Sequence, residues 1–225
     1  MKHLIVGGTK GIGRAIVDRL PETDEIFTIS RGAFEQKPSH VTHFSLDITK
    51  DELPDIEGLE SIVYCPGSIN LKPIGSLKEE DFLEDFNINV MGAVRSIKKY
   101  HRDLKRNNGK IVLFSTVAAK IGMPFHASVA ASKSAIEGLT KSLAAELAPS
   151  VTVNCISPTV TNTPLASQLL RNDKTKEATA ERHPLKRYLE AVEVADLARF
   201  LLGETAKNMT GQIIGIDAGM GSIKS

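Results

Sequence analysis

A single lysine stands in a run of small residues that reads HASVAASKSAIEG, from position 126 to position 138. Val129 precedes this lysine, Lys133, by four residues. Residues four apart share one face of a helix, so an ammonium group and a hydrocarbon side chain are expected to point the same way. What the ammonium group does depends on the class of protein in which this helix lies.

Three glycines near the start of the chain form a second chemically informative feature. Gly7, Gly11 and Gly13 occur in LIVGGTKGIGRAIV, between an apolar run at 3–6 and a helical pattern at 13–20. Glycines in this place allow a tight turn and let backbone N–H groups approach a phosphate at a helix N-terminus. A strand, this loop and a helix together predict a phosphate-binding loop, and a glycine-rich turn without a ligand is the alternative.

Strands and helices alternate along the rest of the chain. Short apolar runs bounded by turn residues read as strands, and longer amphipathic runs read as helices. We expect strands at 3–6, 25–30, 42–48, 61–65, 110–116, 151–157 and 212–218, and helices at 13–20, 79–104, 127–147 and 192–203.

This alternation predicts an α/β fold, a doubly wound parallel sheet of the Rossmann type with helices on both faces. No linker divides the chain, so we expect a single dinucleotide-binding domain over residues 1–225. In such sheets ligands bind beyond the carboxyl ends of the strands, where the glycine loop would lie. Residues 159–190 are polar and irregular, and we expect them to form a lid over the substrate.

Composition and charge exclude several classes of function. The chain has 225 residues, of which 41% are apolar and 24% charged, and its formal net charge is +1. This balance provides no broad basic footprint for nucleic acid or acidic lipid. Cys65 and Cys155 fit no metal-ligand spacing, so we expect free thiols in a reducing compartment and no bound metal. Without a signal-peptide core or a transmembrane run, we expect a cytoplasmic protein with no nucleic-acid or membrane partner.

The G-x-x-x-G-x-G spacing of the loop, together with motifs further along, resembles the short-chain dehydrogenase/reductase family. The downstream motifs are NINVMG around Asn89, STVAA at 115–119, ASK ending at Lys133, SPTVTNTP at 157–164 and IIGIDAG at 213–219. The resemblance covers nearly the whole chain. It implies an oxidoreductase that uses a nicotinamide dinucleotide, assembled as a homodimer or homotetramer.

The second expected strand ends in Ser30 and Arg31, where the resemblance places the adenosine ribose. An acidic residue there would favour NAD, whereas a guanidinium suits a 2′-phosphate, which Lys10 could also reach. We therefore predict NADP(H) as the cofactor. The resemblance implies further cofactor contacts from the glycine loop, the third and fourth strand ends, the active-site helix and the nicotinamide loop, namely Gly7, Thr9, Gly11, Ile12, Gly13, Asp47, Ile48, Pro66, Gly67, Lys133, Thr161 and Thr163.

The catalytic positions of the family fall on Asn89, Thr116 and Lys133, but the position of its tyrosine falls on Val129. In the family the tyrosine exchanges a proton with the substrate oxygen. The lysine binds the nicotinamide ribose and lowers the pKa of the tyrosine through its charge. Valine has neither a donor nor an acceptor, so this part of the reaction needs another group.

The missing tyrosine leaves three functions open. In the first, the chain is an NADP(H)-dependent oxidoreductase of a small carbonyl or alcohol substrate, with weakened or rerouted acid catalysis. Its proton would come from His126, from Tyr64, or from a water held by Lys133 and Asn89. In the second, the chain is a catalytically inactive NADP(H)-binding sensor or interaction protein. In the third, the same fold supports another reaction, such as a dehydration or isomerisation. The first is the function that we expect.

Overall fold

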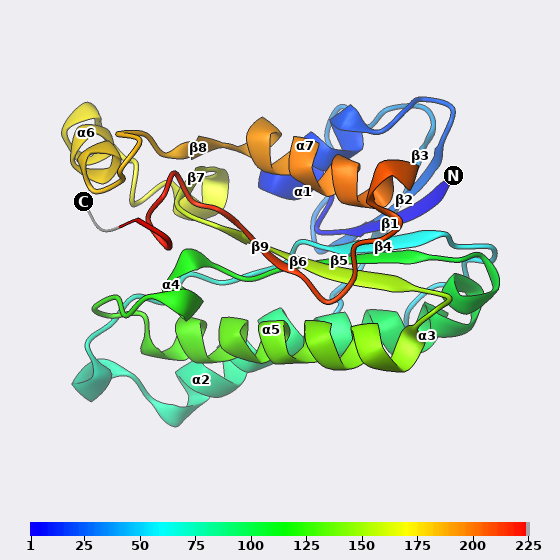
Figure 1. The fold of residues 1–225 in the computed structure, drawn as a ribbon, viewed down its shortest axis with the longest axis horizontal. Coiled ribbons are helices and arrows are strands. Elements are labelled where there is room, and N and C mark those ends of the chain that lie inside the picture. Colours follow the sequence, from blue (N-terminus) through cyan, green and yellow to red (C-terminus); the bar gives the residue numbers. More distant parts are fainter. Residues whose placement is uncertain (224–225) are drawn as a thin grey trace.

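A computed structural model gives the structure of the protein and describes residues 1–223. One sheet of seven strands forms its centre, in the order β3-β2-β1-β4-β5-β6-β9 (Figure 1). Every neighbouring pair is parallel, and the strand order reverses between β1 and β4. The predicted doubly wound α/β fold is therefore confirmed. The strands are β1 (Lys2–Val6), β2 (Glu25–Ser30), β3 (Val41–Ser45), β4 (Ser61–Tyr64), β5 (Lys110–Phe114), β6 (Thr152–Pro158) and β9 (Ile213–Ile216).

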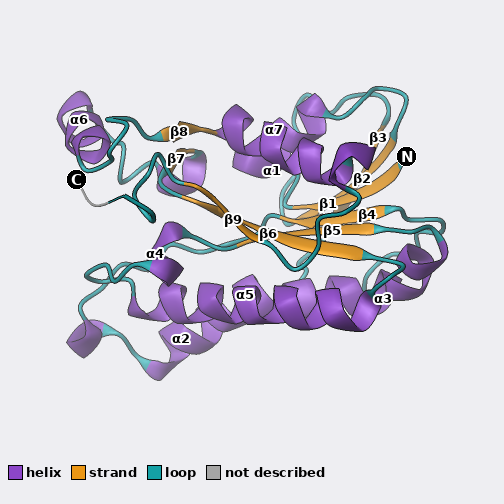
Figure 2. Ribbon diagram, viewed as in Figure 1, coloured by secondary structure: helices purple, strands orange, loops and turns teal. Residues whose placement is uncertain are grey.

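Helices cover both faces of this sheet, and Figure 2 shows the resulting three layers. Helices α1 (Gly11–Arg19) and α7 (Ala191–Leu202) lie on one face. Helices α2 (Glu79–Phe86), α3 (Gly92–Arg106) and α5 (Ala127–Leu147) lie on the other. Each face buries its own apolar cluster. Because both faces are covered, the open end of the sheet, where the strands finish, is the place left for a ligand.

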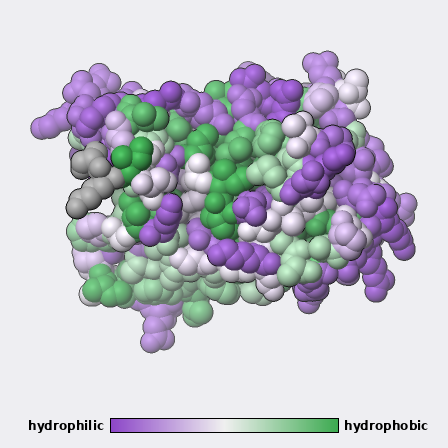
Figure 3. Space-filling model, in the orientation of Figure 1, coloured by the Kyte–Doolittle hydropathy of each residue, from purple (hydrophilic) through white to green (hydrophobic). Residues whose placement is uncertain are grey.

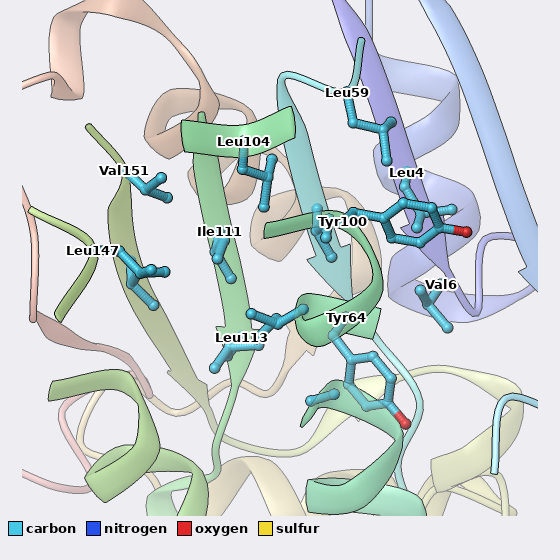
Figure 4. Packing of buried hydrophobic residues seen from close by; sticks show 14 of the residues in the cluster. Leu4, Val6, Leu59, Tyr64, Tyr100, Leu104, Ile111, Leu113, Leu147 and Val151 are labelled. Atoms are coloured by element: carbon cyan, nitrogen blue, oxygen red, sulfur yellow. The ribbon is translucent and has the colours of Figure 1, made fainter. Parts of the chain in front are cut away.

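A π-helical turn interrupts the long helix that the sequence predicts over 79–104. The structure has α2, the π-helical turn Asn87–Met91 and then α3. The cause lies in β4, where the Tyr64 hydroxyl donates to the carbonyl oxygen of Ile88 at 2.6 Å. A Cβ atom on Gly92 would lie 2.0 Å from that hydroxyl, so only glycine fits beside it. Figure 4 shows Tyr64 within the apolar cluster. Such π turns occur frequently at functional sites.

Several other boundaries differ from the sequence-based expectation. Helix α1 starts at Gly11, two residues earlier than predicted, because its first turn is part of the glycine loop. Strand β3 ends at Ser45, so the pair Asp47 and Ile48 lies in the turn that follows. The segment 159–190 contains a small sheet that the sequence did not predict, formed by β7 (Thr161–Asn162) and β8 (Leu189–Glu190). The short helix α6 (Asp173–Glu181) lies between these strands in the chain.

Strand β9 forms one edge of the sheet, and its three isoleucines are only half-buried. Figure 3 shows hydrophobic residues gathered on this face of the molecule, between α7 and α5. Within residues 1–223, none of the helices combines the length and the apolar character that crossing a membrane requires.

Candidate functional site

The loop between β1 and α1 depends on glycine for its shape. Gly7 and Gly11 have φ values of +79° and +55°, in the left-handed region that favours glycine. A Cβ atom on Gly13 would lie 2.3 Å from the carbonyl oxygen of Gly7, so α1 packs directly against the loop. No side chain among the described residues caps the first turn of α1, and that turn has no acidic residue. Its free N–H groups are therefore available to an anion.

A first cleft, with about 980 Å³ of empty space, opens beside this loop over the ends of β1, β2 and β4. Arg31 is exposed at its edge. Asp47 accepts hydrogen bonds from the hydroxyl and the backbone N–H of Thr49, which lower the pKa of its carboxyl group. The Asp47 side chain is therefore an ionised acceptor on the cleft wall. The predicted cofactor residues that line this cleft are Gly7, Ser30, Arg31, Asp47, Ile48, Pro66 and Gly67.

A second cleft, with about 880 Å³ of empty space, continues from the first, and the two share Cys65 and Gly67. Together they form one groove along the carboxyl ends of the strands. Its wall is mostly apolar, with side chains such as Ile69, Leu71 and Leu169. The predicted site residues that the second cleft brings together are Ile12, Gly67, Thr116, His126, Val129, Lys133, Thr161 and Thr163.

The remaining predicted residues of the glycine loop lie beside the groove without lining either cleft. The hydroxyl groups of Thr9 and Ser30 lie 3.1 Å apart and join the ends of β1 and β2. Lys10 is exposed at the N-cap position of α1. A Cβ atom on Gly11 would lie 3.3 Å from the side chain of Thr163, so the segment after β6 starts directly against the loop.

Lys133 lies at the junction of the two clefts. Only 8% of its surface is exposed, and its Nζ donates to the carbonyl oxygen of Phe114 at 2.9 Å. Burial lowers the pKa of Lys133 to about 8. A Cβ atom on Gly67 would lie 3.5 Å from Lys133 Nζ and 3.4 Å from Asn89 Oδ1. The glycine therefore leaves the amine and the amide accessible to a group that passes between the clefts.

Asn89 is fixed by hydrogen bonds to two residues, Ser68 and Asp85, that the sequence did not single out. Its Nδ2 donates to Ser68 Oγ at 2.9 Å and to the Asp85 carbonyl oxygen at 2.7 Å. Ser68 Oγ in turn donates to Asp85 Oδ1 at 2.5 Å. Asp85 is 2% exposed and lies one helical turn before Asn89. That spacing was the available signal, because it places a carboxylate on the same helix face as the predicted site residue.

The polar candidates around Val129 differ in what their side chains already do. Thr116 Oγ1 accepts from the backbone N–H of Ala118 at 3.3 Å and caps the short helix α4 (Val117–Lys120). His126 Nδ1 lies 2.7 Å from the Pro124 carbonyl oxygen and is its donor, which leaves Nε2 facing outward as an acceptor. Val129 itself is 6% exposed and lines the second cleft.

The expectation that Tyr64 faces the site is wrong. Its hydroxyl is engaged with the π-helical turn, and it lines neither cleft. Burial also raises the pKa of Tyr64, which opposes its use as a proton donor at neutral pH. The physical reason is the missing side chain at Gly92, which opens space on the α3 side of β4 and admits the phenol ring there.

The fold and the groove define a dinucleotide-binding protein of the Rossmann class. A family model described as Enoyl-(Acyl carrier protein) reductase matches residues 46–221. The 3-oxoacyl-(acyl-carrier-protein) reductase of Thermotoga maritima is 30% identical to the chain over 244 residues, which cover 96% of each protein. The chain therefore belongs to the short-chain dehydrogenase/reductase family.

Solved structures agree with this assignment. A short chain dehydrogenase family protein from Francisella tularensis matches with a TM-score of 0.90 and 25% identity over 99% of both chains. The structure of ElxO with NADP bound shares the fold, with a TM-score of 0.87 and 23% identity over 99% of both chains. The likeness to these structures shows the shared fold. The named reductases among the sequence relatives show that the chain belongs with oxidoreductases.

Proposed function

We propose that the chain is an NADP(H)-dependent oxidoreductase that interconverts a carbonyl and an alcohol group, with the tyrosine position of the family occupied by Val129. The observation that carries this proposal is Lys133 at the junction of the two clefts, with its amine next to Gly67. The glycine loop fits a pyrophosphate, since its N–H groups are free and a side chain on Gly13 would clash. The nicotinamide would supply the hydride chemistry, and the chain's residues would bind, orient and exchange the proton.

Arg31 supports NADP(H) over NAD(H). It is exposed on the wall of the first cleft, next to Ser30 at the end of β2. No carboxylate stands at this strand end to accept from ribose hydroxyls, and a guanidinium suits a 2′-phosphate. Lys10, exposed at the N-cap position of α1, is a second cation of the glycine loop.

The wall of the second cleft supports an apolar substrate. Thr116 lines this cleft together with five apolar residues, Ile69, Leu71, Val160, Leu165 and Leu169. Burial of apolar surface would supply most of the affinity, while the hydroxyl orients the reacting oxygen. The segment 159–190 is the proposed lid, because Leu165 and Leu169 belong to it and line the cleft.

A catalytically inactive NADP(H)-binding sensor is the second candidate, and Val129 favours it. Loss of a general acid or base removes about 10²–10⁴-fold in rate, while cofactor binding does not need that group. We also propose a cytoplasmic homodimer or homotetramer, supported by the half-buried edge strand β9.

Titration of the purified protein with NADPH and with NADH, followed by nicotinamide fluorescence, tests the proposal first. We expect tighter binding of NADPH, and Arg31→Asp reversing the preference. A panel of medium-chain ketones and 3-oxoacyl thioesters then tests turnover. Binding without turnover on any substrate would establish the sensor, and absence of binding would remove both candidates.

A further inference from the structure

The Ser68, Asp85 and Asn89 cluster connects the second cleft to a buried carboxylate. Ser68 lines the cleft, and its hydroxyl accepts from Asn89 and donates to Asp85. The Ser68–Asp85 distance of 2.5 Å is that of a charge-assisted O–H···O⁻ bond. A serine oxygen has two lone pairs, so Ser68 can accept one more hydrogen bond from a ligand in the cleft.

Three buried polar atoms in this region have no hydrogen-bond partner among residues 1–223. They are Asp85 Oδ2, Asn89 Oδ1 and Ser128 Oγ, the last on α5, which packs against α2. A buried polar atom left without a partner costs about 1–3 kcal/mol, so such a group calls for a reason other than stability.

The cluster lies within electrostatic reach of Lys133. Burial lowers the pKa of Lys133, and the negative charge of Asp85 acts in the opposite direction. The carboxylate is therefore joined to the cleft through a hydroxyl and to the cofactor-side lysine through its charge.

We infer that Ser68 and Asp85 exchange the substrate proton in the place of the absent tyrosine, an inference that rests on the proposed oxidoreductase function. In the oxidation direction, the substrate hydroxyl gives its proton to Ser68 Oγ, while the Ser68 proton moves to Asp85 Oδ1. The hydride leaves the carbinol carbon for the oxidised nicotinamide, and the substrate becomes a ketone. Reduction is the reverse, with the proton returning from Asp85 through Ser68. Ser68 is then a catalytic residue, and Asp85 is a positioning residue that acts through it.

Three other groups that line the cleft, Thr116, Cys65 and His126, are less suited to this step. Thr116 has a hydroxyl, but its oxygen accepts from a backbone N–H and no carboxylate stands behind it among its hydrogen-bond partners. The Cys65 thiol has a pKa raised to about 12 by burial. His126 lines the cleft at the N-cap position of α5, and its Nδ1 is engaged with the Pro124 carbonyl oxygen.

Steady-state kinetics of four variants test the relay. We expect Ser68→Ala and Asp85→Asn to lower kcat by about 10²–10⁴-fold with KM and NADPH affinity nearly unchanged. Ser68→Thr should restore most of the rate, because it returns a hydroxyl. Ser96→Ala is the matched control, since it removes a buried serine hydroxyl on α3 whose one hydrogen bond within residues 1–223 goes to the Gly92 carbonyl oxygen.

Thermal unfolding without cofactor gives a readout that is independent of turnover. Asp85→Asn neutralises a buried carboxylate with one unpartnered oxygen, so we expect an equal or higher Tm than the wild type. A lower Tm with full activity per folded molecule would make Asp85 a structural anchor and overturn the relay. Full activity in Asp85→Asn or Ser68→Ala would also overturn it while leaving the oxidoreductase intact. A wild-type chain that binds NADPH and turns over nothing would overturn both.

Discussion

Two buried polar clusters lie at opposite ends of the sheet, and both contain a serine and an aspartate. At the amino end, His3 Nδ1 lies 2.6 Å from Ser61 Oγ and Nε2 lies 3.0 Å from Asp24 Oδ2. The N-terminal ammonium donates to the other Asp24 oxygen at 2.6 Å. His3 and Ser61 are at most 1% exposed, and neither lines either of the two clefts. At the carboxyl end, the Ser68 cluster faces a cleft and leaves buried oxygens without partners.

Hydrogen-bond satisfaction and access to a cleft distinguish a structural cluster from a functional one more clearly than the types of residue do. Serine, histidine and aspartate are the residue types of a hydrolytic triad, yet at the amino end each group has its partner and no substrate can reach the serine. A cluster whose polar atoms have hydrogen-bond partners stabilises the amino end of the sheet, since these hydrogen bonds offset the cost of burying the polar groups. An unsatisfied cluster beside a cleft keeps bonding capacity for a ligand.

Two buried lysines, one at each end of the sheet, provide a matched pair of variants that tests this difference in function. Lys110 begins β5 at the amino end and bonds Glu204 at 2.7 Å, whereas Lys133 lies at the groove. We expect Lys133→Met to lower kcat/KM by at least about 10²-fold, because the cofactor loses its cation while the core keeps a side chain of similar length. Lys110→Met should retain activity per folded molecule and lose stability only.

Steady-state kinetics with NADPH, together with circular dichroism to verify folding, make this measurement. Equal losses of activity in the two variants would show that the effect of Lys133→Met comes from the burial of the lysine and not from its position at the groove.

A tyrosine at position 129, which we propose to be the family's tyrosine position, tests the carboxyl end by a gain of function. Val129 lines the second cleft next to Lys133, so we expect Val129→Tyr to raise kcat by about 10–100-fold, below the full range of general acid catalysis because Thr116 already caps a helix. Initial rates with the best substrate of the panel give the answer. An unchanged rate in a folded, NADPH-binding variant would mean that the phenol cannot reach the substrate oxygen.

Local sequence patterns predicted most of the fold. They could not predict contacts between residues that lie far apart in the sequence. Helix α5 runs over Ala127–Leu147 as predicted, because Pro149 ends a run of helix formers. The π-helical turn was missed because it depends on Tyr64, which lies 24 residues before Ile88 and touches it only in the folded chain. The Ser68–Asp85 bond joins residues 17 apart in the same way. The shape of the glycine loop was predictable because it follows from the spacing of the glycines, whereas the role of Lys133 is an expectation from the family resemblance.

At the amino end, removal of one member of the satisfied cluster should cost stability and leave chemistry unchanged. His3→Ala leaves Ser61 without its buried partner, so we expect a loss of about 1–3 kcal/mol in the free energy of unfolding. Urea denaturation measures the loss, and NADPH affinity at low urea is the control. A change in NADPH affinity would contradict the assignment of this cluster to structure alone.

The two ends of the sheet should also contribute differently to the pH dependence of the free energy of unfolding. Burial lowers the pKa of His3 below 6.5, so its neutral form is favoured in the folded protein. Between the two pKa values the unfolded chain binds more protons, and stability therefore falls as the pH drops below about 6.5. Burial likewise lowers the pKa of Lys133 from 10.5 to about 8, so stability should rise as the pH increases from about 8 to 10.5.

Urea denaturation of the cofactor-free protein across both pH windows measures these slopes, each below about 1.4 kcal/mol per pH unit for a single group. His3→Ala should remove part of the acidic slope only, and Lys133→Met part of the alkaline slope only. We expect this separation because His3 lies near the start of β1 at the amino end of the sheet, whereas Lys133 lies on α5 at the groove. No hydrogen bond joins the two residues among those that the structure describes. If either variant altered both slopes, the two clusters would be coupled through the sheet and could not be treated as independent.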